Sequence, residues 1–172
     1  APLIIGTELE YPPFSFLDER GEPAGYNVDL TRAVAEALDL DVEIRIGPWS
    51  EIRSALEAGE IDAICGMFHS VERSRRVDFS PPFASIHHAI FVRRTGPVIR
   101  STEDLRDREI IVMRGDIMHD YVLENGLVAE PVVVDNLREA LRLLASGEHD
   151  CALAAKLPGL YWSRELGLTN LV

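Results

Sequence analysis

The sequence predicts an α/β protein built from two similar lobes that are joined by a hinge. Apolar, strand-like runs alternate with amphipathic helical stretches through all 172 residues, which is the order that α/β layers produce. A short pattern, which consists of a helix end, a glycine, an acidic turn and an apolar strand, occurs once in each half, at 56–63 and at 144–151. A breaker with Gly96-Pro97 lies between the two copies. We therefore expect lobe 1 over 1–93, a hinge crossing at 94–97 and lobe 2 over 98–172.

Lobe 1 is expected to contain four strands and two helices. The strands are expected at 3–6, 42–46, 61–65 and 84–93. Asn27 can cap the first helix, whose apolar residues share one face. These residues are Leu30, Ala33, Val34, Ala37 and Leu38. Ser50 can cap the second helix, which would turn Ile52, Ala55 and Leu56 inward and stop at Gly59.

Lobe 2 repeats this scheme after a capping-box-like stretch at 101–104. Strands are expected at 109–113, 131–134, 150–154 and from 170 onward, with helices at 116–124 and 157–165. A further helix would be capped by Asp135 or Asn136 and end at Gly147. Its inward residues are Leu137, Ala140, Leu141 and Leu144.

Composition excludes several classes of function. The formal net charge is −12, which argues against nucleic acid and anionic lipid surfaces, because both need a dense basic face. No apolar run reaches the length of a membrane span. Cys65 and Cys151 lie in apolar runs and are expected to be small buried residues. The histidines show no zinc-ligand spacing, and neighbours His87 and His88 face opposite ways on a strand, so no metal or other cofactor is expected.

A series of short stretches then points to a known family. They are Tyr11-Pro12-Pro13-Phe14, Gly25-Tyr26-Asn27-Val28-Asp29-Leu30, Trp49, Gly59-Glu60-Ile61-Asp62, Gly66-Met67, Ser70-Val71-Glu72-Arg73, Asp78-Phe79-Ser80-Pro81-Pro82-Phe83, Asp104-Leu105 and Val112-Met113-Arg114-Gly115. In order and spacing they resemble the family 3 extracellular solute-binding proteins of the polar amino-acid-binding type. The resemblance implies a type II periplasmic-binding-protein fold. Members of that family return from lobe 2 to lobe 1, so lobe 1 is expected to be incomplete here, with the return truncated, disordered or supplied by another chain.

Two further stretches resemble the binding domains of bacterial sensor histidine kinases and diguanylate cyclases. They are His87-His88-Ala89-Ile90-Phe91-Val92-Arg93 and Gly115-Asp116-Ile117-Met118-His119-Asp120-Tyr121. The resemblance implies an extracytoplasmic sensor domain that is tethered to the inner membrane through segments outside this chain and binds a small organic acid or amino acid in an interlobe cleft. Whether the protein forms a homodimer is left open. The alternative function is that of a transport receptor for amino acids or organic acids.

The resemblance also implies binding residues in lobe 1. Arg73 falls where the family pairs an arginine with a ligand carboxylate, and a guanidinium offers parallel donors that match both oxygens. Tyr11 and Trp49 match aromatic residues that line the cleft, although core packing is an equal explanation for Trp49. Glu8 falls where some members meet a basic ligand side chain, and it could equally be an exposed charge at a strand end.

The stretch Gly66, Met67 and Phe68 matches the strand end whose backbone meets the ligand in the family. Phe68 stands where a small hydroxyl residue is common, so one side-chain hydrogen bond is lost and the pocket is narrower. Ser70 keeps a hydroxyl at the next turn.

Lobe 2 departs further from the family pattern. Gly115-Asp116 replaces a Gly-Thr pair that receives the ligand carboxylate at a helix start. Asp116 is expected to cap that helix or to accept a ligand ammonium. The family's amine-binding acid is replaced by Ala155, beside Lys156, which could meet a second acid group. We therefore expect organic acids to bind more tightly than amino acids.

Two other classes are kept as alternatives. The same fold hosts cyclohexadienyl dehydratases, for which Glu8 or Asp116 could supply an acid, but no catalytic motif is present and we expect no enzyme in this segment. An adaptor with a filled cleft would show no effect of ligand on melting. Asp62 and Asp150 are expected to be structural, each holding the turn at a strand end.

Overall fold

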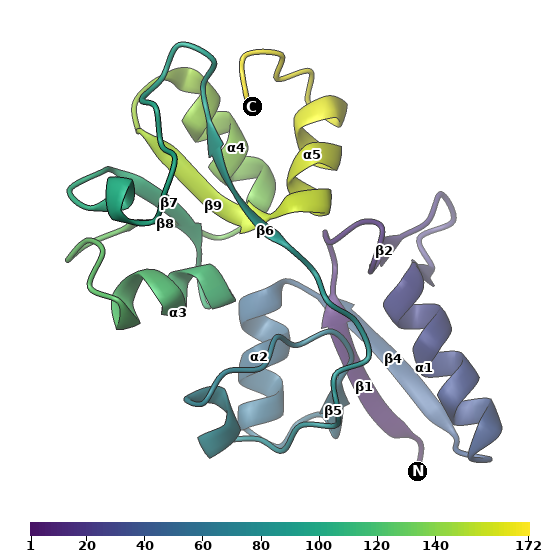
Figure 1. Cartoon of the computed structure of the whole chain (residues 1–172). Coiled ribbons are helices and arrows are strands. Elements are labelled where there is room, and N and C mark those ends of the chain that lie inside the picture. The colour runs from purple at the N-terminus through teal and green to yellow at the C-terminus, as the bar shows by residue number, and fades with distance from the viewer. The chain divides into compact units, whose positions relative to one another are not determined.

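The computed structural model describes every residue from Ala1 to Val172 and contains two compact units, Ala1–Ser85 and Ile86–Val172. Each unit is a β-sheet with helices packed on it (Figure 1). The division lies just before β6 (His88–Val92), because all five residues of β6 pair with β9 (Cys151–Ala155) in the second unit. None of the helices is both long enough and apolar enough to cross a membrane.

Unit 1 is built around a parallel sheet of three strands. The central strand β1 (Leu3–Glu8) lies between β4 (Val42–Gly47) and β5 (Ala63–Ile64). A small antiparallel pair, β2 (Phe16–Leu17) and β3 (Pro23–Ala24), precedes helix α1 (Tyr26–Ala37). Helix α2 (Trp49–Glu57) follows β4, and the short 3-10 helix η1 is Arg73–Arg75. The predicted strand at 61–65 is thus reduced to two residues, and its outer edge pairs with no other strand.

The prediction for the inward face of α1 is wrong. The buried residues of α1 are Asn27, Val28 and Ala35, whereas Val34 and Leu38 are 47% and 62% exposed. The rotation of the helix is set by its first turn, where the amides of Tyr26 and Asn27 donate to carbonyls of residues 13 and 14. These tertiary contacts override the apolar spacing, and Gly25 rather than Asn27 is the N-cap.

Helix α2 follows its predicted pattern except at its start. Ile52 and Ala55 are buried and form a small core with Ile61, against which Leu56 packs. Ser50 is not the cap, because the helix already begins at Trp49, with Pro48 as N-cap and no side-chain bond. Proline suits a helix start because the first amides have no partner within the helix.

Unit 2 has a four-stranded sheet in the order β6-β9-β7-β8, where β7 is Ile110–Met113 and β8 is Val132–Val134. Only β6 runs antiparallel to its neighbour. Its helices are η2 (Glu103–Leu105), α3 (Ile117–Glu124), α4 (Leu137–Ser146) and α5 (Lys156–Glu165). Alternate strand residues face two apolar clusters: α4 and α5 pack against one of them, and η2 and α3 pack against the other.

The prediction for α4 is confirmed in detail. Asn136 is the cap, with its side chain accepting from the amide of Glu139 at 2.8 Å. All four predicted inward residues are buried, and Gly147 closes the helix in the left-handed conformation. Arg93, which follows β6, donates to the carbonyls of Leu144 and His149. A positively charged side chain thus binds carbonyl groups near the end of this helix.

The two acidic turns have the same structural role in the two units, as predicted. The Asp62 carboxylate accepts from the amide of Ile4 at 2.8 Å, and the Asp150 carboxylate accepts from the amide of Glu109 at 3.1 Å. Each aspartate amide also donates to the carbonyl of the same partner. The repeated sequence pattern therefore forms the same hydrogen-bonded turn in both units, and this turn links the start of one strand to the start of its neighbour.

Both cysteines are free thiols; Cys151 is buried, as predicted, whereas Cys65 is only partly buried. Burial raises the pKa of Cys151 to about 12, so this thiol stays protonated near neutral pH. Burial also raises the pKa of Cys65, although a hydrogen bond with Thr31 partly opposes this shift.

Candidate functional site

The carboxyl ends of the three parallel strands bring several predicted site residues to one edge of the unit 1 sheet. Glu8 ends β1 and lies opposite Gly47, which ends β4. Trp49 follows β4 after one residue and begins α2, and Gly66 follows β5 after one residue. Ligands of open α/β sheets bind at this edge, because the loops that leave the strands gather there.

The end of β5 is held in place from the central strand. The amide of Cys65 donates to the carbonyl of Gly6 at 3.0 Å, and the buried Thr7 hydroxyl donates to the carbonyl of Cys65 at 3.1 Å. Gly66 then takes a positive φ of 102°, which favours glycine because it has no Cβ. Gly66 and Met67 border a cavity of about 500 Å³ that is also lined by β5 and by residues 77–80 and 83.

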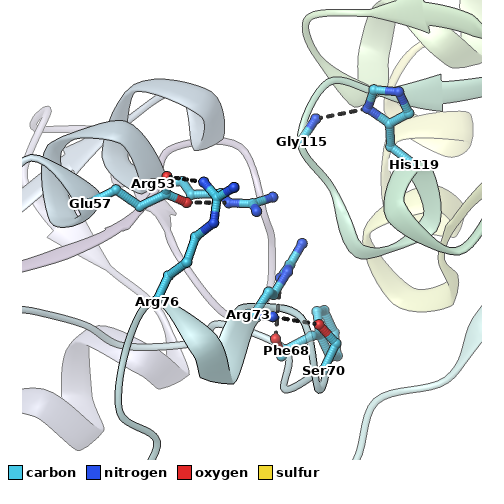
Figure 2. Close-up of polar contacts among 8 residues, drawn as sticks. All are labelled: Arg53, Glu57, Phe68, Ser70, Arg73, Arg76, Gly115 and His119. Carbon is cyan, nitrogen blue, oxygen red and sulfur yellow. Dashed lines mark hydrogen bonds and ion pairs between the residues drawn. The ribbon is translucent and has the colours of Figure 1, made fainter. Parts of the chain in front are cut away.

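Arg73 is 2% exposed and begins η1. Its Nη1 donates to the carbonyl of Phe68 at 3.2 Å, and its guanidinium carbon lies 5.8 Å from the centre of the Trp49 ring. The hydroxyl of Ser70 accepts from the Arg73 amide at 3.1 Å, which fixes the first turn of η1 (Figure 2). The structure therefore brings together four predicted residues, Trp49, Phe68, Ser70 and Arg73. The Arg73 guanidinium contacts the Phe68 carbonyl and the Trp49 ring.

The neighbouring arginines are arranged differently. Arg75 is exposed and pairs with Glu72 at 2.8 Å, and Arg76 pairs with Glu57 at 3.0 Å. Glu57 also accepts from Arg53 at 3.1 Å, so both of its carboxylate oxygens are used (Figure 2). These two arginines thus lie in surface ion pairs, which contribute little to stability, whereas Arg73 is buried.

Tyr11 is buried in the turn that follows β1, with its ring 5.5 Å from that of Phe14. Its backbone pairs with Ser15, so the turn is closed on itself. Glu8 is half-buried. The structure places Glu8 and Tyr11 on the same strand end, and their contact with a ligand stays a prediction.

In unit 2, the loop between β7 and α3 is closed by its own side chains. The Asp116 carboxylate caps α3 by accepting from the amide of Met118 at 3.0 Å. The amide of Gly115 donates to Nδ1 of His119 at 3.2 Å (Figure 2). Asp116 therefore has the capping role that was expected of it, and an additional role toward a ligand ammonium stays a prediction.

Lys156 is the exposed first residue of α5 and follows the buried Ala155 at the end of β9. Its amide donates to the carbonyl of His87, so the backbone is fixed while the ammonium reaches solvent. No group of histidine, cysteine or acidic side chains in the chain is arranged to hold a metal ion.

Three residues near these positions were missed by sequence reasoning. Thr7, near the end of β1, and Asn27, in the first turn of α1, are buried polar residues, and His119 lies against Gly115. Asn27 was interpreted as a helix cap because asparagine is common there. The sequence showed only that Asn27 is a polar residue near a helix start. Spacing alone does not distinguish such a residue from a helix cap.

Comparison with known proteins identifies the family. The model of the bacterial extracellular solute-binding proteins, family 3, matches residues 3–115. A probable amino-acid ABC transporter-binding protein of Haemophilus influenzae is 30% identical over 164 residues, which are 95% of this chain and 63% of that protein. The chain thus spans less than two thirds of the length of this relative.

Solved structures agree with this assignment. A histidine kinase sensor domain with similarity to periplasmic binding proteins is 46% identical, with a TM-score of 0.93 over 99% of this chain and 75% of that one. An ancestral arginine-binding protein bound to glutamine is 31% identical, with a TM-score of 0.85 over 99% and 76%. These relatives are binding proteins and a sensor domain, and the fold is the predicted type II periplasmic-binding-protein fold. The chain belongs to the bacterial extracellular solute-binding proteins of family 3.

Proposed function

We propose that this chain is the extracytoplasmic ligand-binding domain of a signal-transduction protein, and that it binds a small solute through a carboxylate. The observation that supports this most strongly is the buried Arg73, which is held by the Phe68 carbonyl and the Trp49 ring at the strand ends. The similarity to a histidine kinase sensor domain at 46% identity supports the sensor role. Membrane tethering is part of the same proposal.

The chemistry follows from the state of the guanidinium. Arginine keeps its charge at all ordinary pH values and has five donors in a rigid fork. One nitrogen is used by Phe68, so the side chain is oriented before a ligand arrives. A pre-oriented donor loses less entropy on binding than a mobile one, and this raises affinity without new contacts.

The ligand class can be tested by calorimetry. Succinate, L-glutamine and L-arginine serve as probes, and we expect succinate to bind most tightly because Ala155 has replaced an acid that would hold an ammonium. Binding of an amino acid without binding of succinate would show that Asp116 or another acid receives the amine, and would reject the preference for organic acids. If neither class binds, the proposal is wrong.

A transport receptor is the second candidate, because the Haemophilus influenzae relative is a probable transporter-binding protein. The two roles differ in what the ligand changes. A sensor predicts that ligand changes the autophosphorylation rate of the full-length protein in membranes. Ligand-dependent stimulation of a transporter ATPase, with no effect on phosphorylation, would favour the receptor instead.

A further inference from the structure

Asn27 is a polar residue that is buried without an evident use. It lies in the first turn of α1 and is only 5% exposed. Its backbone is fully engaged, because the amide donates to the carbonyl of Phe14 at 2.7 Å and its carbonyl accepts from the Thr31 hydroxyl at 2.7 Å. Its side-chain amide, with two donors and one acceptor, makes no hydrogen bond within the protein. Neither its nitrogen nor its oxygen is among the fully enclosed unpaired atoms, so both are open to water or to a ligand.

The side chain is directed at the end of β5. A Cβ placed on Gly66 would lie 2.3 Å from Nδ2 of Asn27 and 3.2 Å from its Cγ. Only a glycine leaves this space, and the positive φ of Gly66 restricts the position to glycine independently. The donor end of the amide therefore occupies the place where a side chain would otherwise cover the strand end, next to the residues already assigned to the ligand.

We propose that Asn27 is a ligand-contacting residue, whose Nδ2 donates to an oxygen of the bound solute at the end of β5. This inference rests on the proposed function and makes it more specific. In this proposal Arg73 of η1 and Asn27 of α1 bind different atoms of the solute. The ligand class is then a carboxylate with a second oxygen acceptor, such as a dicarboxylate or a carboxamide.

The test compares Asn27→Ala and Asn27→Asp with a matched control, Ser15→Ala. The hydroxyl of Ser15 is buried without a partner, and Ser15 is fully enclosed, so it should not reach a ligand. Calorimetry with succinate, L-glutamine and L-arginine measures affinity, and thermal melting of the ligand-free protein measures stability. Asn27→Asp keeps the shape of the side chain, so it carries the test if Asn27→Ala does not fold.

We expect Asn27→Ala to weaken binding of the best probe about tenfold, the value of one hydrogen bond to a charged or polar ligand group. Its melting temperature should fall no more than that of Ser15→Ala, because no protein hydrogen bond is lost. Asn27→Asp should weaken the binding of succinate more than the binding of L-glutamine, because the new carboxylate repels a dianion more strongly than a zwitterion.

Unchanged affinity in Asn27→Ala, with wild-type binding intact, would overturn the role of Asn27 and leave the proposed function standing. A large loss of stability in the ligand-free variant would show that the amide has a structural role instead. If the wild-type protein binds none of the probes, the proposed function fails first, and this inference fails with it.

Discussion

Replacing Arg73 and Trp49, singly and together, measures how firmly the protein itself holds the guanidinium. Arg73→Met removes the charge and keeps most of the side-chain length, and Trp49→Leu removes the aromatic face and keeps an apolar residue at the start of α2. The two groups are 5.8 Å apart, within the range of a cation–π contact. Each single variant also loses other contacts, so only the coupling between the two is informative.

The expected coupling free energy is about 1–2 kcal/mol, because such contacts contribute about 0.5–1 kcal/mol at exposed sites and about 2 kcal/mol when desolvated. Arg73 is 2% exposed, which places it toward the upper end. Urea unfolding of the wild type, both single variants and the double variant of the ligand-free protein gives the value. The same cycle with Arg75→Met in place of Arg73→Met is the control, since Arg75 is exposed and pairs with Glu72. A coupling that equals the control would refute a pre-oriented arginine.

Three further predictions concern the framework around the site. Gly159→Ala should destabilise the protein by about 1–3 kcal/mol in urea unfolding, because the new Cβ would lie 2.2 Å from the ring of Phe91. Adding Phe91→Leu should recover part of this stability. A double variant that is as unstable as Gly159→Ala would contradict the geometry. Cys151 should react with a thiol reagent at pH 8 far more slowly than Cys65, because burial raises the pKa of Cys151 to about 12 and leaves little thiolate to react. Equal reaction rates of the two thiols in the native protein would be inconsistent with this. Asp150→Ala should cost about 1 kcal/mol, and Asp150→Asn less, since an asparagine oxygen can still accept from the same amide.

Local signals determined how much of the fold could be predicted. Helix α4 was predicted with its buried face and its terminal glycine, and with its cap at Asp135 or Asn136, because the capping residues, the leucine spacing and Gly147 all agree. The acidic turns at Asp62 and Asp150 were also recognised, since the same short phrase occurs twice.

The face of α1 could not be predicted from spacing. Its apolar residues occur on more than one side, and the choice between the sides is made by amide bonds from Tyr26 and Asn27 to a distant turn. Helix periodicity gives a direction only when a single apolar face is present. The short β5 was overestimated for a similar reason, because its length depends on pairing rather than on its own sequence.

The candidate site was predicted unevenly. The position of Arg73 came from a motif, and the structure adds the carbonyl and the ring that hold it. Asn27 was misinterpreted because an asparagine near a helix start has a common structural explanation. Its contact with Gly66 joins residues that are far apart in the sequence, and no local pattern reports such a contact.

The most direct measurement is the affinity of Arg73→Ala and Arg75→Ala for whichever probe the wild-type protein binds. Loss of a buried charged partner of a carboxylate costs about 2–5 kcal/mol, so Arg73→Ala should bind at least about 30-fold more weakly by calorimetry. Arg75→Ala, two residues along the chain and exposed, should bind like the wild type. Wild-type affinity in Arg73→Ala, with a correctly folded protein, would contradict the claim that this guanidinium anchors the ligand.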